Sequence, residues 1–279
     1  MKYNKLNNGV EIPSLGYGAF LVADGNECIK SIRCALESGY RHIDTAAAYK
    51  NEESVGIAIS ESGITREEIF ITTKLSNNAQ RSLDIEGAFS QSMDKLGVDY
   101  IDLYIIHWPV KECFVNSWLE LEKIYQSGRA KAIGVSNFME HHLDEIKKVW
   151  SVVPALNQIE LHPRLTRKPL VKYCEQLGIT VESWSPLGGS WESGGLKDNL
   201  LENETLQAIA TKYSKTVAQI ILRWNIELGI VAIPKSVTPS RIKENIDIFD
   251  FNLTAEDITV IDNLNMDRRG GPDPDNFNF

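Results

Sequence analysis

Four side chains with acid–base or hydrogen-bonding chemistry follow three consecutive apolar segments of the sequence. Asp44 lies at the end of segment 41–45, Tyr49 in the loop after it, Lys74 at the end of 70–74 and His107 at the end of 101–107. If these segments are neighbouring parallel strands, their carboxyl ends meet at one face, where barrel enzymes place their sites. The pattern therefore predicts a catalytic set of Asp44, Tyr49, Lys74 and His107.

The chemistry that this set suits is the reduction of a carbonyl group by hydride transfer. Hydride delivery builds negative charge on the carbonyl oxygen, so a proton donor must stand beside it. Tyr49 is a slow donor at an ordinary pKa of about 10, and the ammonium of Lys74 would lower that pKa. Asp44 would keep Lys74 charged, and His107 would polarise the carbonyl oxygen through a hydrogen bond. The scheme requires no metal.

Each of the four residues also has a purely structural interpretation. Asp44 could cap the next helix and Lys74 could point into solvent. Tyr49 could be a packed loop aromatic, and His107 a hydrogen-bonded core histidine. Because all four fall at three neighbouring strand ends, their joint position favours catalysis over four separate structural roles.

Short β-rich segments alternate with amphipathic helical stretches, as parallel strands joined by crossover helices require. Strands are expected at 15–20, 41–45, 70–74, 101–107, 132–135, 155–158, 180–185 and 230–234. A hairpin precedes them, with strands at 3–6 and 10–12 around a turn at 7–9. The sequence thus predicts an α/β fold, a (β/α)8 TIM barrel with an N-terminal β-hairpin. No linker divides the chain, so residues 1–279 are expected to form a single domain.

Local signals indicate where helices begin and end. Glycine follows six helical stretches, at positions 39, 63, 97, 128, 178 and 229, as a usual C-terminal stop. The spacings Thr65-x-x-Glu68 and Asn137-x-x-Glu140 resemble helix capping boxes. The Gly-rich segment 188–203 is long enough to be a mobile lid. The tail, 268–279, is expected to lie over the barrel mouth or to be partly disordered.

Three longer motifs, in order along the chain, resemble the signatures of the aldo-keto reductases. They are GYRHIDTAAAYKNEESVG at 39–56, GRAKAIGVSNF at 128–138 and IPKS at 233–236. The resemblance implies that Asp44, Tyr49, Lys74 and His107 match the family tetrad, with Tyr49 as the proton donor. Within the family, the chain most resembles the microbial branch of glyoxal/methylglyoxal reductases, 2,5-diketo-D-gluconate reductases and prostaglandin F synthases.

The expected cofactor is NADPH, bound outside a Rossmann motif. No GxGxxG follows the first strand, so a Rossmann site is not supported. The segment 235–241 leads into a helix, with Thr238 a plausible N-cap, and helix N-termini attract anions. Lys235, Ser236 and Arg241 add charge and donors, which suits the 2′-phosphate of NADPH. The alternative is a solvated basic helix start.

The resemblance assigns further cofactor contacts. It implies that Ser136, Asn137 and Gln158 hold the nicotinamide amide and that Trp184 stacks on the nicotinamide ring; Asn137 could instead be only a helix cap. Further family cofactor contacts match Ser185, Leu187, Glu244 and Asn245, the last two toward the adenine. Two alternatives to a reductase remain open: a Schiff-base aldolase using Lys74, and a non-catalytic NADPH-binding subunit.

The substrate pocket is expected to have an aromatic wall. Phe20, Tyr49 and Trp108 would form it beside His107. Many relatives carry Trp where this chain has Ser76, and the connection 108–115 is shorter than in many of them. These departures predict an open, less apolar pocket. We therefore expect small aldehydes, dicarbonyls or keto sugars, reduced to alcohols, in preference to steroids.

Composition limits the possible partners. The 279 residues include 29 Lys and Arg against 38 Asp and Glu, a net charge of −9, which argues against a broad basic surface for nucleic acid or anionic membrane. The four cysteines lack zinc-ligand spacing and suit free thiols in a reducing compartment.

The N-terminus lacks the apolar stretch of a signal peptide, and no segment is long enough to span a membrane. We expect a cytoplasmic protein, as a monomer.

Overall fold

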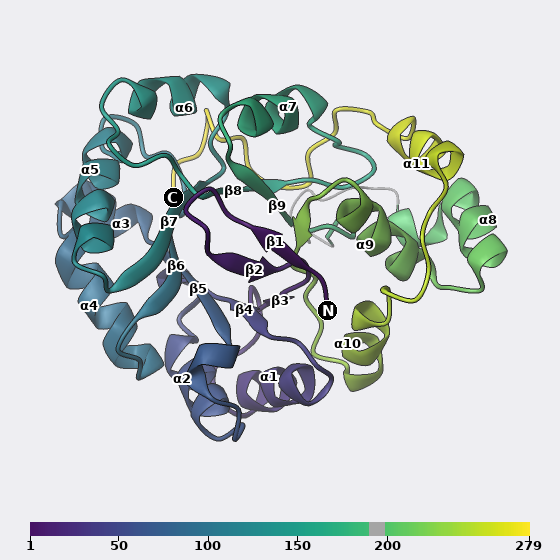
Figure 1. The fold of residues 1–279 in the computed structure, drawn as a ribbon, viewed down its shortest axis with the longest axis horizontal. Helices are drawn as coiled ribbons and strands as arrows, with labels where there is room; N and C mark the ends of the chain where they lie inside the picture. The colour runs from purple at the N-terminus through teal and green to yellow at the C-terminus, as the bar shows by residue number, and fades with distance from the viewer. Residues whose placement is uncertain (190–198) are drawn as a thin grey trace.

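The computed structural model describes residues 1–189 and 199–279, and its centre is a ring of eight parallel strands (Figure 1). In spatial order, which is also chain order, they are β3 (Tyr17–Gly18), β4 (His42–Asp44), β5 (Phe70–Leu75), β6 (Ile101–Ile106), β7 (Ala130–Ser136), β8 (Leu156–Glu160), β9 (Thr180–Trp184) and β10 (Val231–Ala232). Backbone hydrogen bonds join the first strand region to the last: the amide of Gly16 donates to Ala232 O at 2.8 Å, and that of Gly18 to Pro234 O at 3.1 Å. These bonds close the predicted barrel.

The register of the strands brings the predicted catalytic residues to one end of the ring. Gly18 pairs with Asp44, Asp44 with Thr72, and Thr72 with Leu103. Lys74 lies two residues beyond Thr72 along β5, so its side chain emerges on the same face of the strand. All residues of β5 and β6 are buried, as strands covered by a barrel interior and by helices must be.

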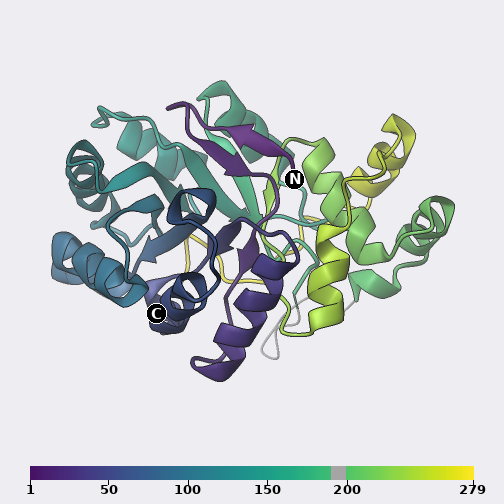
Figure 2. The same ribbon diagram turned by 60° about the horizontal axis from the view of Figure 1, so that its bottom comes forward.

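Helices surround the ring and cover its outer face (Figures 1 and 2). The crossover helices are α1 (Asn26–Glu37), α2 (Glu52–Ser60), α4 (Ile85–Leu96), α5 (Phe114–Gln126), α6 (Glu140–Lys147), α7 (Lys168–Gln176), α9 (Val217–Glu227) and α10 (Pro239–Ile246). Additional helices are α3 (Asn77–Ser82), α8 (Glu204–Tyr213) and α11 (Ala255–Asp262), with 3-10 turns η1 (Ala47–Tyr49), η2 (Arg66–Glu68) and η3 (Leu200–Glu202). The six predicted stop glycines all have positive φ, and Gly97 is the left-handed C-cap of α4.

The two predicted capping boxes have different outcomes. Thr65 is the N-cap of η2, where its hydroxyl donates to the Glu68 side chain at 2.9 Å but caps no backbone amide. The box at Asn137 is wrong, because α6 begins after Met139. Asn137 has a φ of 64° and turns its side chain toward the barrel mouth instead.

The N-terminal hairpin lies across the end of the barrel opposite the carboxyl ends of the strands. It consists of β1 (Tyr3–Lys5) and β2 (Glu11–Pro13), which pair antiparallel, and Figure 1 shows it crossing the centre of the ring. Leu6 and Ile12 pack there against residues from the strands, among them Phe70 and Leu103. The hairpin therefore plugs the barrel floor with apolar side chains, at the end opposite the one where barrel enzymes place their sites.

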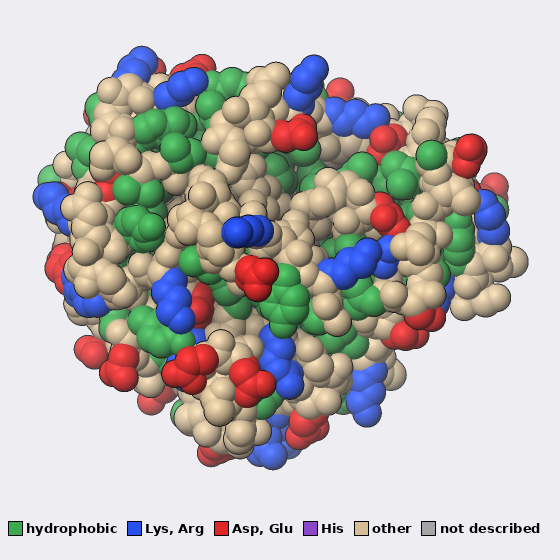
Figure 3. Space-filling model, in the orientation of Figure 1, with side chains coloured by type: hydrophobic (Ala, Val, Ile, Leu, Met, Phe, Trp, Pro, Cys, Tyr) green, Lys and Arg blue, Asp and Glu red, His purple; other side chains and the backbone are tan. Residues whose placement is uncertain are grey.

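Several expectations about the surface can be compared with the structure. Acidic and basic side chains are interspersed on the hairpin face (Figure 3). The four cysteines, all in the described ranges, are free. Within those ranges, none of the helices has the length and apolarity needed to cross a bilayer. Of the predicted lid at 188–203, residues 190–198 lie outside the described residues.

Candidate active site

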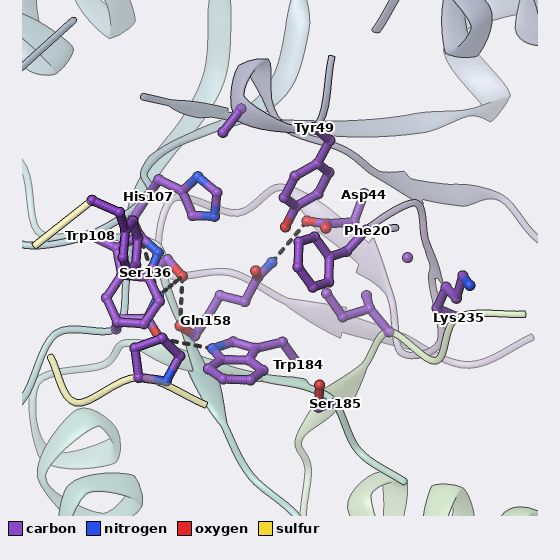
Figure 4. A pocket seen from close by; sticks show the side chains of 16 residues that line it. Phe20, Asp44, Tyr49, His107, Trp108, Ser136, Gln158, Trp184, Ser185 and Lys235 are labelled. Atoms are coloured by element: carbon purple, nitrogen blue, oxygen red, sulfur yellow. Dashed lines mark hydrogen bonds between the residues drawn. The ribbon is translucent and has the colours of Figure 1, made fainter. Parts of the chain in front are cut away.

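A cavity of about 440 Å³ opens at the carboxyl ends of the strands. Three members of the predicted catalytic set, Asp44, Tyr49 and His107, contribute to its wall (Figure 4). The fourth, Lys74, is fully buried next to the wall, 2.6 Å from Asp44. The complete lining is Gly18, Phe20, Asp44, Ala48, Tyr49, His107, Trp108, Ser136, Asn137, Gln158, Trp184, Ser185, Ile233, Lys235, Pro272 and Phe279. The fold thus brings the four residues together as the sequence predicts.

Asp44 and Lys74 form a buried ion pair at the base of the cavity. Lys74 Nζ donates to Asp44 Oδ1 at 2.6 Å and to the carbonyl oxygen of Thr45 at 2.8 Å, and its side chain is 0 % exposed. Burial alone would favour the neutral amine, but its acidic neighbours, Asp44 first among them, together outweigh burial and raise the pKa of Lys74. Lys74 is therefore a fixed ammonium, as the proposed chemistry needs.

The phenol of Tyr49 lies next to this ammonium. Lys74 Nζ is 4.9 Å from the centre of the Tyr49 ring, which η1 holds in place just before Lys50 ends the turn in the left-handed conformation. Burial raises the pKa of Tyr49, while the charge of Lys74 and a hydrogen bond with it act to lower that pKa. Lys74 lowers the pKa of Tyr49, as the sequence predicts. The expected net lowering of that pKa is nevertheless wrong, because burial and the negative charge of Asp44 outweigh the effect of Lys74.

His107 faces Tyr49 from the end of β6. The two ring centres are 5.6 Å apart in an edge-to-face arrangement. Burial, and then the positive charge of Lys74, lower the pKa of His107 well below its usual range, so the imidazole is neutral. A neutral imidazole keeps one N–H donor. His107 can thus donate a hydrogen bond to an oxygen in the cavity without carrying a proton charge.

Asn137 organises the opposite wall. Its Oδ1 accepts from Trp184 Nε1 at 2.8 Å, and its Nδ2 donates to His107 O at 3.0 Å and to Ser136 Oγ at 3.1 Å. Ser136 in turn donates to the backbone oxygen of Gln158 at 2.9 Å. The helix-cap interpretation of Asn137 is therefore wrong, because its side chain joins three strand ends instead of a helix N-terminus.

The remaining predicted cofactor residues fall into two groups. Ser185, with a left-handed φ of 48°, and Lys235 line the cavity. The other five, though all described, are not among the lining residues: they are Leu187, Ser236, Arg241, Glu244 and Asn245. Except for Leu187, which packs on the core, they lie on α10 or just before it. Thr238 is the N-cap of α10 as expected, with Pro239 first in the helix, but its side chain makes no capping bond.

Aromatic rings from distant parts of the chain form the outer wall. Phe20 lies 5.0 Å from Tyr49 between ring centres, and Trp108 lies 5.2 Å from Phe277 and 5.3 Å from Phe279. The tail supplies aromatic rings to this wall that an inspection of Ser76 and the short connection after β6 could not reveal. The sequence feature that could have revealed this contribution is the pair of phenylalanines near the end of the chain, Phe277 and Phe279.

The tail lies over the barrel mouth, the first of the two expected alternatives. Glu160, at the end of β8, accepts hydrogen bonds from the amides of Gly270 at 2.5 Å and Gly271 at 3.2 Å. The tail backbone passes close to Trp184, since a Cβ built on Gly271 would lie only 2.3 Å from the edge of the indole. These contacts hold the tail segment that contains Pro272 against the cavity.

One cluster of possible metal ligands occurs among the described residues, outside the cavity. His141, His142 and Asp275 place their ligand atoms within 4.8 Å of one another. The amide of Met139 donates to His142 Nδ1 at 3.1 Å, so the proton of the neutral ring lies on Nε2, which faces Asp275 at 3.3 Å. This cluster therefore works as a second hydrogen-bonded anchor for the tail.

Sequence reasoning missed one buried acid beneath the cavity. Glu182 of β9 accepts a hydrogen bond from Gln158 Nε2 at 2.5 Å, and the same nitrogen donates to Asp44 Oδ2 at 2.8 Å. Burial, followed by the negative charge of Asp44, raises the pKa of Glu182 to about 8. The sequence feature that could have revealed Glu182 is its position in the middle of a predicted buried strand, where a charged side chain is rarely exposed to water.

Comparison with known proteins identifies the family. The model of the Aldo/keto reductase family matches residues 14–266. The chain is 52% identical to a glyoxal reductase of Bacillus subtilis, over 99% of this chain and 97% of that protein. It is 45% identical to methylglyoxal reductase DkgA of Escherichia coli, over 98% and 97%.

A solved structure agrees with these matches. A Bombyx mori aldo-keto reductase in complex with NADP superposes with a TM-score of 0.90 at 38% identity, covering 98% of this chain and 96% of that one. Fold, motifs and site geometry thus point the same way, and the chain belongs to the aldo/keto reductase family.

Proposed function

We propose that this protein is an NADPH-dependent reductase of small aldehydes and dicarbonyl compounds, with Tyr49 as the proton donor. The observation that carries the proposal is the position of the Tyr49 phenol, on the cavity wall between the buried Asp44–Lys74 pair and the neutral ring of His107. A donor, a cation to stabilise the phenolate that it leaves behind, and a second hydrogen-bond donor are what carbonyl reduction requires.

Each residue then has one step in the reaction. When bound, NADPH would supply the hydride that reduces the carbonyl carbon. His107 donates its N–H to the carbonyl oxygen and so orients the substrate, while Tyr49 transfers its hydroxyl proton to that oxygen as negative charge develops there. Lys74 stabilises the resulting phenolate, and Asp44 keeps Lys74 charged. The products are the alcohol and the oxidised cofactor.

The residues of the cavity fit the nicotinamide end of the cofactor. Trp184 presents its indole at the wall, and Asn137 Oδ1 has a second lone pair beyond the one used by Trp184. We assign Ser136, Asn137 and Gln158 to the nicotinamide amide. Ser185, Leu187 and Lys235 are assigned to the cofactor between its two ends.

We place the adenine end at the start of α10. Arg241 is exposed in the first turn of this helix, where the helix dipole also favours a phosphate. Together with Lys235 and Ser236 it would select the 2′-phosphate of NADPH, and Glu244 and Asn245 would contact the adenine side. The NADP complex of the Bombyx mori relative supports this choice of cofactor.

The shape of the cavity and the relatives favour small dicarbonyls as substrates. A volume of about 440 Å³ has to hold the reacting end of the cofactor as well as the substrate, which leaves room for a compact molecule. The named activities of the two enzymes from Bacillus subtilis and Escherichia coli are glyoxal and methylglyoxal reduction. Keto sugars and simple aldehydes come next in our order of preference.

The burial of Lys74 speaks against a Schiff-base aldolase. An amine nucleophile must reach its substrate and lose its proton. Lys74 is instead 0 % exposed, is paired with Asp44, and has a raised pKa. A non-catalytic NADPH-binding subunit would leave the assembled group of Asp44, Tyr49 and His107 without a role.

The test is a substrate screen with purified protein. NADPH oxidation is followed with methylglyoxal, glyoxal, benzaldehyde and a keto sugar, and kcat/KM is expected to be highest for the dicarbonyls. Borohydride is added in parallel to trap any Schiff base. Covalent trapping on Lys74, or the absence of NADPH oxidation with every carbonyl compound, would overturn the proposal.

We also propose that residues 1–279 act as one domain and as a monomer. One large core cluster, which includes side chains from Leu15 to Ile261, supports the first statement. Light scattering coupled to gel filtration should give the mass of one chain, about 31.3 kDa. A mass of twice that value or more would contradict the monomer.

A further inference from the structure

Two carboxyl groups share one amide nitrogen beneath the cavity. Gln158 Nε2 donates one hydrogen to Asp44 Oδ2 at 2.8 Å and the other to Glu182 Oε1 at 2.5 Å. Both carboxyl groups are buried, at 2 % and 0 % exposure. Two negative charges so close together and so far from water would repel each other strongly.

The charges around Glu182 show how this repulsion is avoided. The titratable groups that face it are Asp44 and His42 of β4, Lys74 of β5 and Tyr49 of η1. Burial, and then the charge of Lys74, lower the pKa of His42 to about 3, so its ring is neutral. Lys74 is the one cation among these groups, and it lies against Asp44 at 2.6 Å. One cation neutralises one carboxylate, so the second carboxyl group must keep its proton.

The hydrogen-bond partners indicate where that proton resides. Within the described residues, neither Glu182 Oε2 nor His42 Nδ1 has a hydrogen-bond partner, and these two atoms are 3.9 Å apart. His42 Nε2 lies 3.0 Å from Thr72 Oγ1, to which it can donate, which leaves Nδ1 as the acceptor of the ring. A proton on Glu182 Oε2 would therefore point at a nitrogen lone pair.

We propose that Glu182 is a positioning residue that remains a neutral acid at physiological pH and, through the Gln158 amide, fixes both Gln158 and Asp44 beneath Tyr49. With both hydrogens of Gln158 Nε2 taken, the carbonyl oxygen of this amide is left for the cavity, where the proposed function uses Gln158 to hold the nicotinamide amide. The effect of Glu182 on catalysis rests on that proposed function, whereas the presence of a proton on Glu182 does not depend on it.

Loss of the Glu182 proton has a predictable consequence. The raised pKa of about 8 means that the acid ionises as the pH rises through that value. The new negative charge lies next to Asp44 and makes the phenolate of Tyr49 less favourable, since a charge on Glu182 raises the pKa of Tyr49. Carbonyl reduction should therefore decline above about pH 8, with Glu182 as one cause.

Glu182→Gln tests this, because glutamine has the shape of the protonated acid and cannot ionise. We expect kcat/KM of the variant to match the wild type within about twofold near pH 6.5, and to exceed it by up to about tenfold near pH 9, one unit above that pKa, where the full tenfold corresponds to an inactive ionised form. Glu122→Gln is the matched control, since Glu122 is also buried, on α5, and accepts bonds from Trp118 and Ser151, none of which lines the cavity. Its pH profile should follow the wild type; identical profiles for all three proteins would overturn the proposal.

A second readout does not depend on turnover. Infrared difference spectra of the cofactor-free protein between about pH 6 and about pH 10 should show a carboxylic-acid carbonyl band that disappears with a midpoint near 8. The band should persist in Glu122→Gln and be missing in Glu182→Gln. If the band titrates but no carbonyl compound is reduced, only the proposed function fails; if reduction occurs without such a band, only the role of Glu182 fails.

Discussion

At the scale of single residues, the site is defined by one cation and the acids around it. Lys74 is buried with Asp44, and the pKa of each group depends on the presence of the other. Burial raises the pKa of Tyr49 against the pull of Lys74, so the tyrosine is protonated before the reaction begins. A protonated donor next to a fixed ammonium suits reduction, because the proton is released only when negative charge forms on the substrate.

Tyr49→Phe should remove the proton donor and little else. We expect kcat to fall about 10²- to 10⁴-fold, the usual contribution of a positioned acid, while the Kd for NADPH changes less than about twofold. Steady-state kinetics and quenching of tryptophan fluorescence by NADPH measure the two quantities. Turnover at the wild-type rate would refute the role of Tyr49.

The Asp44–Lys74 pair can be tested by a double-mutant cycle. Asp44→Ala leaves an ammonium buried without its partner, which should lower the free energy of unfolding by about 3–5 kcal/mol. Asp44→Ala combined with Lys74→Met should recover part of that loss, because the unpaired charge is gone. Urea unfolding curves give these values. If the double variant loses more free energy of unfolding than the two single variants lose together, the two residues do not stabilise each other as a buried ion pair.

At the scale of elements, two segments outside the strands complete the site. The start of α10 offers exposed basic groups, and the tail covers the mouth with aromatic rings. Both are positioned by backbone features: Thr238 and Pro239 begin α10, and Glu160 holds the amides of Gly270 and Gly271. Cofactor choice and substrate access should therefore respond separately to changes in these two elements.

Arg241→Ala should weaken NADPH binding specifically. Loss of a hydrogen bond to a charged phosphate costs about 1.5–3 kcal/mol, so the KM for NADPH should rise roughly 10- to 150-fold while that for NADH stays nearly constant. Lys243→Ala, an exposed cation of the same helix, serves as the control and should affect both cofactors weakly. An equal rise of both KM values in Arg241→Ala would argue against a 2′-phosphate contact.

Gly271→Ala should displace the tail from the barrel mouth. The added methyl group would clash with the edge of the Trp184 indole, which its bond to Asn137 holds in place, so the tail backbone has to shift away from it. We expect faster cleavage of the tail in limited proteolysis and a higher KM for carbonyl substrates. Glu160→Ala, which removes the anchor itself, should do the same. Unchanged proteolysis in both variants would show that these contacts do not hold the tail.

At the scale of the whole molecule, stability and chemistry occupy opposite ends of one barrel. The hairpin fills the floor with Leu6 and Ile12, whereas the cavity lies at the carboxyl ends of the strands. Changes at the floor should thus affect folding without affecting the reaction.

Ile12→Ala tests this separation. Truncating a fully buried isoleucine should lower the free energy of unfolding by about 2–5 kcal/mol, since it removes apolar contacts and leaves a cavity. Below the unfolding transition, kcat should remain within about twofold of the wild type. Tyr3→Ala, in the same hairpin but 53% exposed, should change stability by less than about 0.5 kcal/mol. A large loss of kcat in Ile12→Ala would show that the two ends are coupled.

Much of the barrel could be predicted from local patterns. Alternating apolar segments and glycine stops give the order of strands and helices, and β6 ends within one residue of the expected 101–107. The bounds of the first strand are predicted less accurately: β3 includes only Tyr17–Gly18, whereas the expected strand was 15–20. Where the ring closes, a Cβ on Gly18 would lie 2.9 Å from the oxygen of Ile233, so the pairing depends on a distant segment that no local pattern describes.

By itself, the sequence determined which residues could carry out the chemistry: strand-end side chains and long motifs are local features, so Asp44, Tyr49, Lys74 and His107 could be named from them. Only the tertiary structure decided the state of those groups. Burial raised the pKa of Tyr49, Glu182 came to share Gln158 with Asp44, and the tail laid Phe279 on Trp108. Desolvation and contacts between distant segments arise only when the barrel closes, because they depend on neighbours in space and not in sequence.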